Sequence, residues 1–307
     1  MDFRASASTS LYPFQLTFYF QLMTRQQLVD QIFSKGTYLC VGLDTDLSKI
    51  PVHLQDHPNA LFEFNRQIID ATKDYCVSYK INTAFYEAYG VKGWQALEET
   101  VAYIPDTHFK IADAKRGDIG NTSAQYAKAF FETIPFDAIT VAPYMGSDSV
   151  KPFLEYDGKW TILLGLTSNS GAKDFELQQV ETTTVLLEEG VHTTQRHTHF
   201  LYEKVLATAS GWGNTENLMF VIGATQADQF AAIRKLTPEH FYLVPGVGTQ
   251  GGSLRDISEI AMTADCGLLV NVSRAIIYAA EGEDFATEAG AIAQQYAVEM
   301  KTYLDAL

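Results

Sequence analysis

The stretch FKIADAKRGD, residues 109–118, begins as a largely apolar run and ends in a series of charged residues. The amphipathic stretch Ala124–Phe131 follows it. A short apolar run that passes through polar or glycine residues into a helical pattern is typical of a buried parallel strand and its covering helix. Seven further runs of this kind occur along the chain: Tyr38–Leu43, Val77–Ile81, Ala138–Ala142, Thr161–Leu166, Leu218–Ile222, Phe241–Val244 and Gly267–Val272.

Eight such units predict an α/β protein built as a single (β/α)8 barrel, the TIM barrel. The amphipathic stretches Ala60–Thr72 and Trp94–Tyr103 lie between the runs, and Phe285–Leu307 is expected to close the chain as a helix. The length of 307 residues suits one large domain, and no repeat or low-complexity linker marks a boundary. An open, doubly wound sheet is the alternative architecture.

The first 22 residues stand apart from this pattern. We expect residues 1–22 to be a disordered or loosely packed N-terminal extension and residues 23–307 to form the catalytic domain; an added edge element is the alternative for the extension. Gln15 and Gln21 interrupt its apolar part, which is too short to span a bilayer. The stretch also lacks the basic start and unbroken apolar run of a signal peptide. We therefore expect a cytoplasmic protein with no membrane partner.

Composition narrows the classes of partner. The formal net charge is -15, and a nucleic-acid groove needs clusters of Lys and Arg, so we expect no nucleic-acid partner. A small anionic ligand is compatible with this charge, because a few well-placed donors can outweigh the average field. The three cysteines, Cys40, Cys76 and Cys266, form neither a disulfide framework nor a metal-ligand spacing. We expect them to be buried, reduced thiols.

A histidine-rich piece, His192–His199, lies in the longest segment between two predicted strands. Such a cluster raises the possibility of a metal site. Its histidines stand among Gln, Thr and Arg with no acidic or Cys partner nearby, so a solvated surface loop is the favoured interpretation.

Charged residues gather where the first three predicted strands end. Asp44 follows the first run, Lys80 lies in the second, and Asp113 and Lys115 close the third, with Asp118 in the loop beyond. Side chains alternate along a strand, so Asp113 and Lys115 point the same way and can both face the barrel mouth, where active sites of this fold lie. Buried charges need partners, so we expect an alternating network of two lysines and two aspartates. A salt-bridge cluster that only fixes the strand register is the alternative.

A second group of residues follows the last two strands. The loop Pro245–Gly252 is rich in glycine, and Arg274 follows the eighth run within Asn271-Val272-Ser273-Arg274. Barrels frequently bind phosphate in these two loops, where glycines let backbone N–H groups approach an anion and an arginine can make a bidentate contact. The two groups together predict a site for a phosphorylated small molecule beside a Lys/Asp array. A run of turn glycines and a surface arginine is the alternative.

Three segments carry a family resemblance. Asp113-Ala114-Lys115-Arg116-Gly117-Asp118 matches the D-x-K-x-x-D signature of orotidine 5'-phosphate decarboxylases. Lys80-Ile81-Asn82-Thr83-Ala84-Phe85-Tyr86-Glu87 resembles the strand-2 region of the longer bacterial branch of that family, and Pro245–Gly252 resembles its phosphate loop. The matches come in family order and, with Asp44 and Arg274, cover about residues 37 to 280.

The resemblance implies a cofactor-free decarboxylation of orotidine 5'-phosphate to uridine 5'-phosphate, the last step of de novo pyrimidine nucleotide synthesis. Lys115 would protonate C6 as carbon dioxide leaves, and Asp113 would lie against the substrate carboxylate. Lys80 would hold the network and the ribose, and Asp44 would bind ribose hydroxyls.

The resemblance also implies a homodimer. Asp118 would enter the site from the neighbouring subunit, and Thr122 would reach across with it. No metal is implied.

Contacts at the two ends of the substrate are implied in the same way. Thr167 would hydrogen-bond the pyrimidine, with Ser168 as the second candidate. Gln250 and Arg274 would hold the phosphate. The N-terminal extension and the His-rich piece depart from the family pattern and receive no catalytic part.

Three other functions compete with this one. The first is a metal-dependent phosphosugar lyase or synthase of the same barrel superfamily, since D-x-K-x-x-D also occurs there. The second is a Schiff-base aldolase with Lys80 or Lys115 as nucleophile. The third is a non-catalytic barrel that binds pyrimidine nucleotides. Chelator sensitivity, borohydride trapping and turnover of orotidine 5'-phosphate distinguish these three functions from the cofactor-free decarboxylation.

Overall fold

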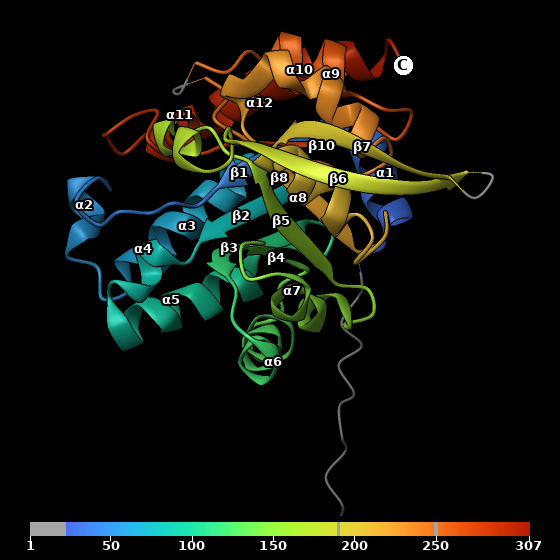
Figure 1. Cartoon of the computed structure of the whole chain (residues 1–307). Helices are drawn as coiled ribbons and strands as arrows, with labels where there is room; N and C mark the ends of the chain where they lie inside the picture. The colour runs from blue at the N-terminus through green and yellow to red at the C-terminus, as the bar shows by residue number, and fades with distance from the viewer. Residues whose placement is uncertain (1–22, 189–190, 249–250) are drawn as a thin grey trace, which may run out of the picture.

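A closed barrel of eight parallel strands forms the centre of the computed structural model, which describes residues 23–188, 191–248 and 251–307 (Figure 1). The strand order is β1-β10-β9-β8-β5-β4-β3-β2, and β1 pairs with both β2 and β10. The (β/α)8 prediction is therefore confirmed, and the open-sheet alternative is wrong. The expectation for residues 1–22 lies outside the described residues.

Helices surround the barrel and cover its strands (Figure 1). The barrel strands are β1 (Leu39–Gly42), β2 (Ser78–Asn82), β3 (Phe109–Arg116), β4 (Ala138–Val141), β5 (Trp160–Leu166), β8 (Leu218–Ile222), β9 (Tyr242–Pro245) and β10 (Leu268–Val272). The helices are α1 (Arg25–Lys35), α2 (Val52–Gln55), α3 (Ala60–Thr72), α4 (Ala84–Glu87), α5 (Gly90–Tyr103), α6 (Gly120–Lys128), α7 (Ser147–Leu154), α8 (Leu201–Ala209), α9 (Ala227–Leu236), α10 (Leu254–Ala261), α11 (Arg274–Ile277) and α12 (Phe285–Leu304).

The strands are buried on both sides, which explains why they appear in the sequence as short apolar runs and not as alternating patterns. Every residue of β1, β4, β8 and β10 is buried. The three cysteines are free and buried, as expected, and burial raises the pKa of each thiol to about 12. They are therefore inert packing residues.

A β-hairpin replaces the loop that we expected around His192–His199. Its strands β6 (Gln179–Glu188) and β7 (Val191–Phe200) pair antiparallel over ten positions and extend away from the barrel as the yellow ribbon of Figure 1. The loop prediction is wrong because Thr and Val favour extended backbone and the two strands satisfy each other's backbone hydrogen bonds.

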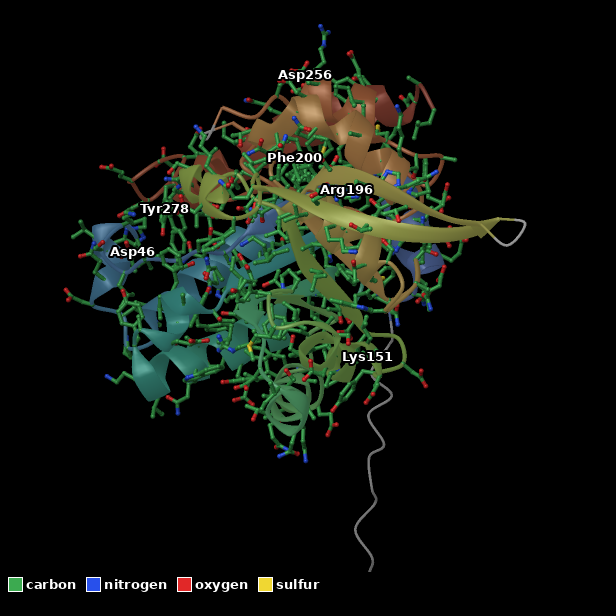
Figure 2. All side chains as sticks on the ribbon, in the orientation of Figure 1. Asp46, Lys151, Arg196, Phe200, Asp256 and Tyr278 are labelled. Atoms are coloured by element: carbon green, nitrogen blue, oxygen red, sulfur yellow. The ribbon has the colours of Figure 1, made fainter. Side chains whose placement is uncertain are left out.

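The expected solvation of this piece is confirmed for residues 194–198, all of which are exposed. Arg196, on the hairpin (Figure 2), has a side chain 74% exposed and lies 3.7 Å from Glu181 on the opposite strand. The side chain of His192 lies outside the described residues. Among the described side chains, no group of three or more His, Cys, Asp or Glu is arranged to hold a metal ion.

Candidate active site

A cavity of about 270 Å³ opens at the carboxyl ends of the barrel strands, close to the lower end of the usual range for small-molecule sites, roughly 300–1,000 Å³. Both predicted groups of residues contribute to its wall. It is lined by Asp44, Lys80, Asn82, Asp113, Lys115, Thr140, Leu164, Thr167, Ser168, Asn169, Val221, Leu243, Pro245, Gly246, Val247, Asn271, Ser273 and Arg274.

One aspartate joins two lysines in this cavity. Asp113 Oδ1 lies 2.6 Å from Lys115 Nζ, and Asp113 Oδ2 lies 2.9 Å from Lys80 Nζ. Lys80 Nζ also lies 3.3 Å from Asp44 Oδ1. The four side chains therefore form the expected alternating chain of charges, Asp44–Lys80–Asp113–Lys115, at the mouth of the barrel.

Burial and pairing fix the charges of the two inner members. Burial alone would lower the pKa of Lys80, but the carboxylates of Asp113 and Asp44 outweigh it and raise that pKa well above its ordinary value. Burial would likewise raise the pKa of Asp113, but the ammonium groups of Lys80 and Lys115 outweigh it and hold that pKa well below its ordinary value. At neutral pH the inner pair is fully charged.

The backbone leaves the regular strand where it carries Lys115. The β3–β4 register shifts between Ala112 and Arg116, and Lys115 has a φ of 46°, in the left-handed region that non-glycine residues rarely adopt. Its side chain is half exposed, whereas that of Asp113 is 10% exposed. The nearly buried Asp113 carboxylate is therefore paired with a Lys115 ammonium group that is accessible from the cavity.

Thr140, on β4, is a site residue that the sequence analysis missed. It is 1% exposed; its Oγ1 donates to Asp113 Oδ1 at 3.1 Å and accepts from the backbone N–H of Lys115 at 2.9 Å. A polar residue near the carboxyl end of the run Ala138–Ala142 is a signal that could have found it, because barrel active sites lie at those ends.

A tyrosine after β10 holds the loop that carries Asp44. The Tyr278 hydroxyl donates to the Asp44 carbonyl at 3.1 Å and accepts from the Asp46 N–H at 2.8 Å. Tyr278 and Asp46 are neighbours in Figure 2, beside the barrel. This clamp fixes Asp44 against Lys80.

The loop after β5 brings Thr167 and Ser168 into the cavity wall. Thr167 Oγ1 lies 2.6 Å from Asn169 Oδ1 and 2.9 Å from Glu176 Oε1, and its backbone N–H donates to Glu176 Oε2 at 2.7 Å. Glu176 therefore anchors the start of this loop, which continues into the hairpin.

Another part of the wall comes from the loops after β9 and β10. Gly246 has a φ of 99°, and a Cβ on Gly252 would stand 2.3 Å from Ala224 Cβ, so both positions require glycine. Arg274 is exposed and lines the same wall as Gly246 and Val247. The structure thus brings Arg274 to the cavity that holds the lysines, whereas Gln250 lies outside the described residues.

Two predicted site residues do not reach this cavity in the single chain. Asp118 and Thr122 are absent from the described residues that line it. Asp118 lies just before α6, where its N–H donates to Ser123 Oγ at 3.1 Å, and Thr122 is exposed on α6.

The fold and this cavity together define a (β/α)8-barrel protein with a lysine–carboxylate site at the carboxyl ends of its strands. The model of the family described as "Orotidine 5'-phosphate decarboxylase / HUMPS family" matches residues 37–289. The chain belongs to this family.

Individual relatives agree with the family match. The chain is 54% identical to an orotidine 5'-phosphate decarboxylase of Phocaeicola vulgatus, over 91% of this chain and 98% of that protein. It is 52% identical to one from Bacteroides fragilis, over 93% of this chain and all of that protein.

Solved structures give the same picture. An OMP decarboxylase of Leishmania donovani is similar with a TM-score of 0.71 and 32% identity, over 91% of this chain and 99% of that one. A UMP synthase of the same organism matches with a TM-score of 0.71 and 34% identity, over 88% of this chain; the match spans 56% of that longer chain.

Among the described residues, no helix has the length and apolar character needed to cross a bilayer.

Proposed function

We propose that this chain converts orotidine 5'-phosphate to uridine 5'-phosphate and carbon dioxide. The observation that carries the proposal is that the ammonium groups of Lys115 and Lys80 lie 2.6 Å and 2.9 Å from the Asp113 carboxylate, in a cavity that Arg274 also lines. The relatives that span almost the whole chain are named for this decarboxylation.

The reaction places negative charge on a carbon. When the bond between C6 and the carboxylate breaks, its electron pair stays on C6, where no ring orbital is suited to delocalise it. The Lys115 ammonium stabilises that charge and then transfers a proton to C6, and Lys115 regains a proton from solvent. Asp113 lies where it disfavours the substrate carboxylate, and Lys80 holds Asp113 in its charged form.

The remaining contacts bind and orient the nucleotide. Asp44 takes ribose hydroxyls, and Thr167, with Ser168 as the alternative, takes the pyrimidine edge. Arg274 and Gln250 take the phosphate. Because the phosphate lies far from the reacting carbon, its binding energy serves to close and organise the site.

We propose a homodimer that completes each site with Asp118 and Thr122 of the other subunit. Exposed apolar side chains in loops near this region support a contact surface: Ile119 is 59%, Tyr144 86% and Met145 49% exposed. Large exposed apolar groups that lie together mark interaction sites more often than isolated ones. We propose no partner besides this second copy and the nucleotide: no cofactor, no nucleic acid and no membrane. We also propose that the protein is cytoplasmic.

The function is tested by adding the purified protein to orotidine 5'-phosphate and following the decrease in the absorbance of this substrate, with and without a chelator. We expect turnover in both conditions. Loss of activity with the chelator would favour the metal-dependent lyase or synthase, and binding of uridine 5'-phosphate without turnover would favour the nucleotide-binding barrel. Borohydride inactivation with a sugar phosphate would favour the aldolase.

A further inference from the structure

We propose that Thr140 is a positioning residue that sets the Lys115 ammonium at the reacting carbon, an inference that rests on the proposed function. One hydroxyl contacts both partners of the catalytic ion pair: it donates to the Asp113 carboxylate at 3.1 Å and accepts from the Lys115 N–H at 2.9 Å.

The backbone geometry explains why Lys115 needs this contact. Ala112 pairs with Ile139 and Arg116 pairs with Val141, so β3 advances four residues over the stretch in which β4 advances two. Lys115 lies inside this irregular segment, where the regular ladder is interrupted. The Thr140 hydroxyl accepts from the Lys115 N–H in place of a strand carbonyl, so this N–H keeps a hydrogen-bond partner where the ladder is interrupted.

The same contact holds an unusual conformation. The φ of 46° at Lys115 is strained for a residue with a Cβ, and strained residues persist only where their surroundings fix them. Packing alone cannot fix the side chain, because it is half exposed. The hydrogen bond from its N–H and the ion pair to Asp113 are therefore its restraints, and Thr140 contacts both.

The hydroxyl also orients the acid. Asp113 Oδ1 accepts from Thr140 as well as from Lys115, which leaves Oδ2 for Lys80. Without the hydroxyl, the carboxylate can rotate and Lys115 can move with it. Displacements of about 1 Å at a reacting group can cost roughly 100-fold in rate.

Two substitutions of Thr140 and one control substitution test the proposal. Thr140→Val keeps the shape and removes the hydroxyl, and Thr140→Ser keeps the hydroxyl. We expect Thr140→Val to lower kcat by roughly 10- to 100-fold with KM changed less than threefold, and Thr140→Ser to retain most of the activity. The matched control is Thr161→Val on β5, a threonine that is also fully buried and whose hydroxyl has no partner among the described residues. It should leave kcat unchanged.

The outcomes separate this proposal from the one it rests on. If the unaltered protein fails to turn over orotidine 5'-phosphate, the proposed function fails. If it turns over the substrate and Thr140→Val has the kcat of Thr161→Val, the positioning role is wrong. Should Thr140→Val not fold, Thr140→Ala against Thr140→Ser isolates the same hydroxyl, and equal kcat values would overturn the proposal. A fall in thermal stability alone, with kcat intact in the folded fraction, would also overturn it.

Discussion

Lys115 and Asp113 are two positions apart on β3 and form an ion pair of 2.6 Å, although the chain between Ala112 and Arg116 does not follow the regular strand. Regular alternation would turn both side chains to one face. In the structure, the left-handed backbone at Lys115 leaves its side chain half exposed above a nearly buried acid. The irregular segment therefore makes one member of the pair accessible to a ligand while the other stays fixed in the barrel.

Replacing Lys115 with alanine should abolish turnover in a folded protein. The substitution removes the proposed proton donor and charge-stabilising group, and we expect kcat to fall by roughly 100- to 10,000-fold or more. Asp113 keeps its contacts with Lys80 and Thr140, so the melting temperature should change little. Steady-state kinetics and thermal unfolding measure both effects. Lys92→Ala, which removes an exposed lysine on α5, is the control; substantial activity in Lys115→Ala would contradict the role.

Replacing Lys80 with alanine should instead destabilise the fold. Lys80 is 4% exposed and pairs with two carboxylates, so its loss leaves Asp44 without Lys80 and the nearly buried Asp113 with Lys115 as its remaining cation. Breaking a buried pair costs roughly 3–5 kcal/mol. Chemical denaturation compares this variant with Lys115→Ala, and equal free energies of unfolding in the two would show that the inner ion pairs do not stabilise the barrel.

Replacing Arg274 with alanine should weaken substrate binding more than it slows the chemistry. Arg274 lines the cavity together with Gly246 and Val247 of the glycine-rich loop, and in the proposed pose it binds the phosphate and not the reacting carbon. Losing charge-assisted hydrogen bonds of roughly 1.5–3 kcal/mol should raise KM by about 10- to 100-fold. Arg255→Ala, at an exposed arginine of α10, is the matched control. An unchanged KM in Arg274→Ala would remove Arg274 from the phosphate site.

The strand-end rule predicted most of this cavity from sequence. Asp44, Asp113 and Lys115 follow or close an apolar run and Lys80 lies within one, near its end, and parallel strands bring those ends together. Thr140 lies near a strand end, which makes it a candidate, but threonine is common in strands for reasons of shape alone, so that position does not show whether its hydroxyl bridges two residues or only packs.

The hairpin was missed for a related reason. Its strands show little apolar alternation because they lie outside the barrel core, and their stability comes from pairing with each other, which no local period reveals. The left-handed backbone at Lys115 likewise depends on its contact with Thr140, 25 positions later in the chain.

Acid should destabilise the protein through His240, at the amino-terminal end of the barrel. His240 is 8% exposed, packs against Phe220, and has no hydrogen-bond partner for either ring nitrogen in the described part of the chain. Burial, together with the nearby charges of Arg234 and Arg25, lowers its pKa to about 4.

The folded protein keeps the His240 imidazole uncharged, so protonation of this side chain lowers the free energy of unfolding. Stability should be complete above the ordinary histidine pKa of about 6.5 and should fall as the pH drops toward 4, by roughly 1.4 kcal/mol per unit of pKa shift. Urea unfolding between pH 7.5 and 4 should show a shallower decline for His240→Leu than for the unaltered protein. The control is His53→Leu, at an exposed histidine; an identical decline in His240→Leu would exclude this origin.

Two inactive variants should restore activity when mixed, if each site is shared between subunits. Asp118 does not line the cavity of its own chain within the described residues, so in the proposed dimer Lys115 of one subunit works with Asp118 of the other. A dimer of Lys115→Ala with Asp118→Ala then has one site with both lesions and one with neither. Random exchange makes half of the dimers mixed, each with one intact site, so activity should recover to about a quarter of the unaltered level. A chain carrying both substitutions, mixed with Lys115→Ala, can build no intact site and is the control. Asp118→Ala alone should be inactive; if it is, and exchange proven by labelled subunits brings no recovery, Asp118 acts within its own chain.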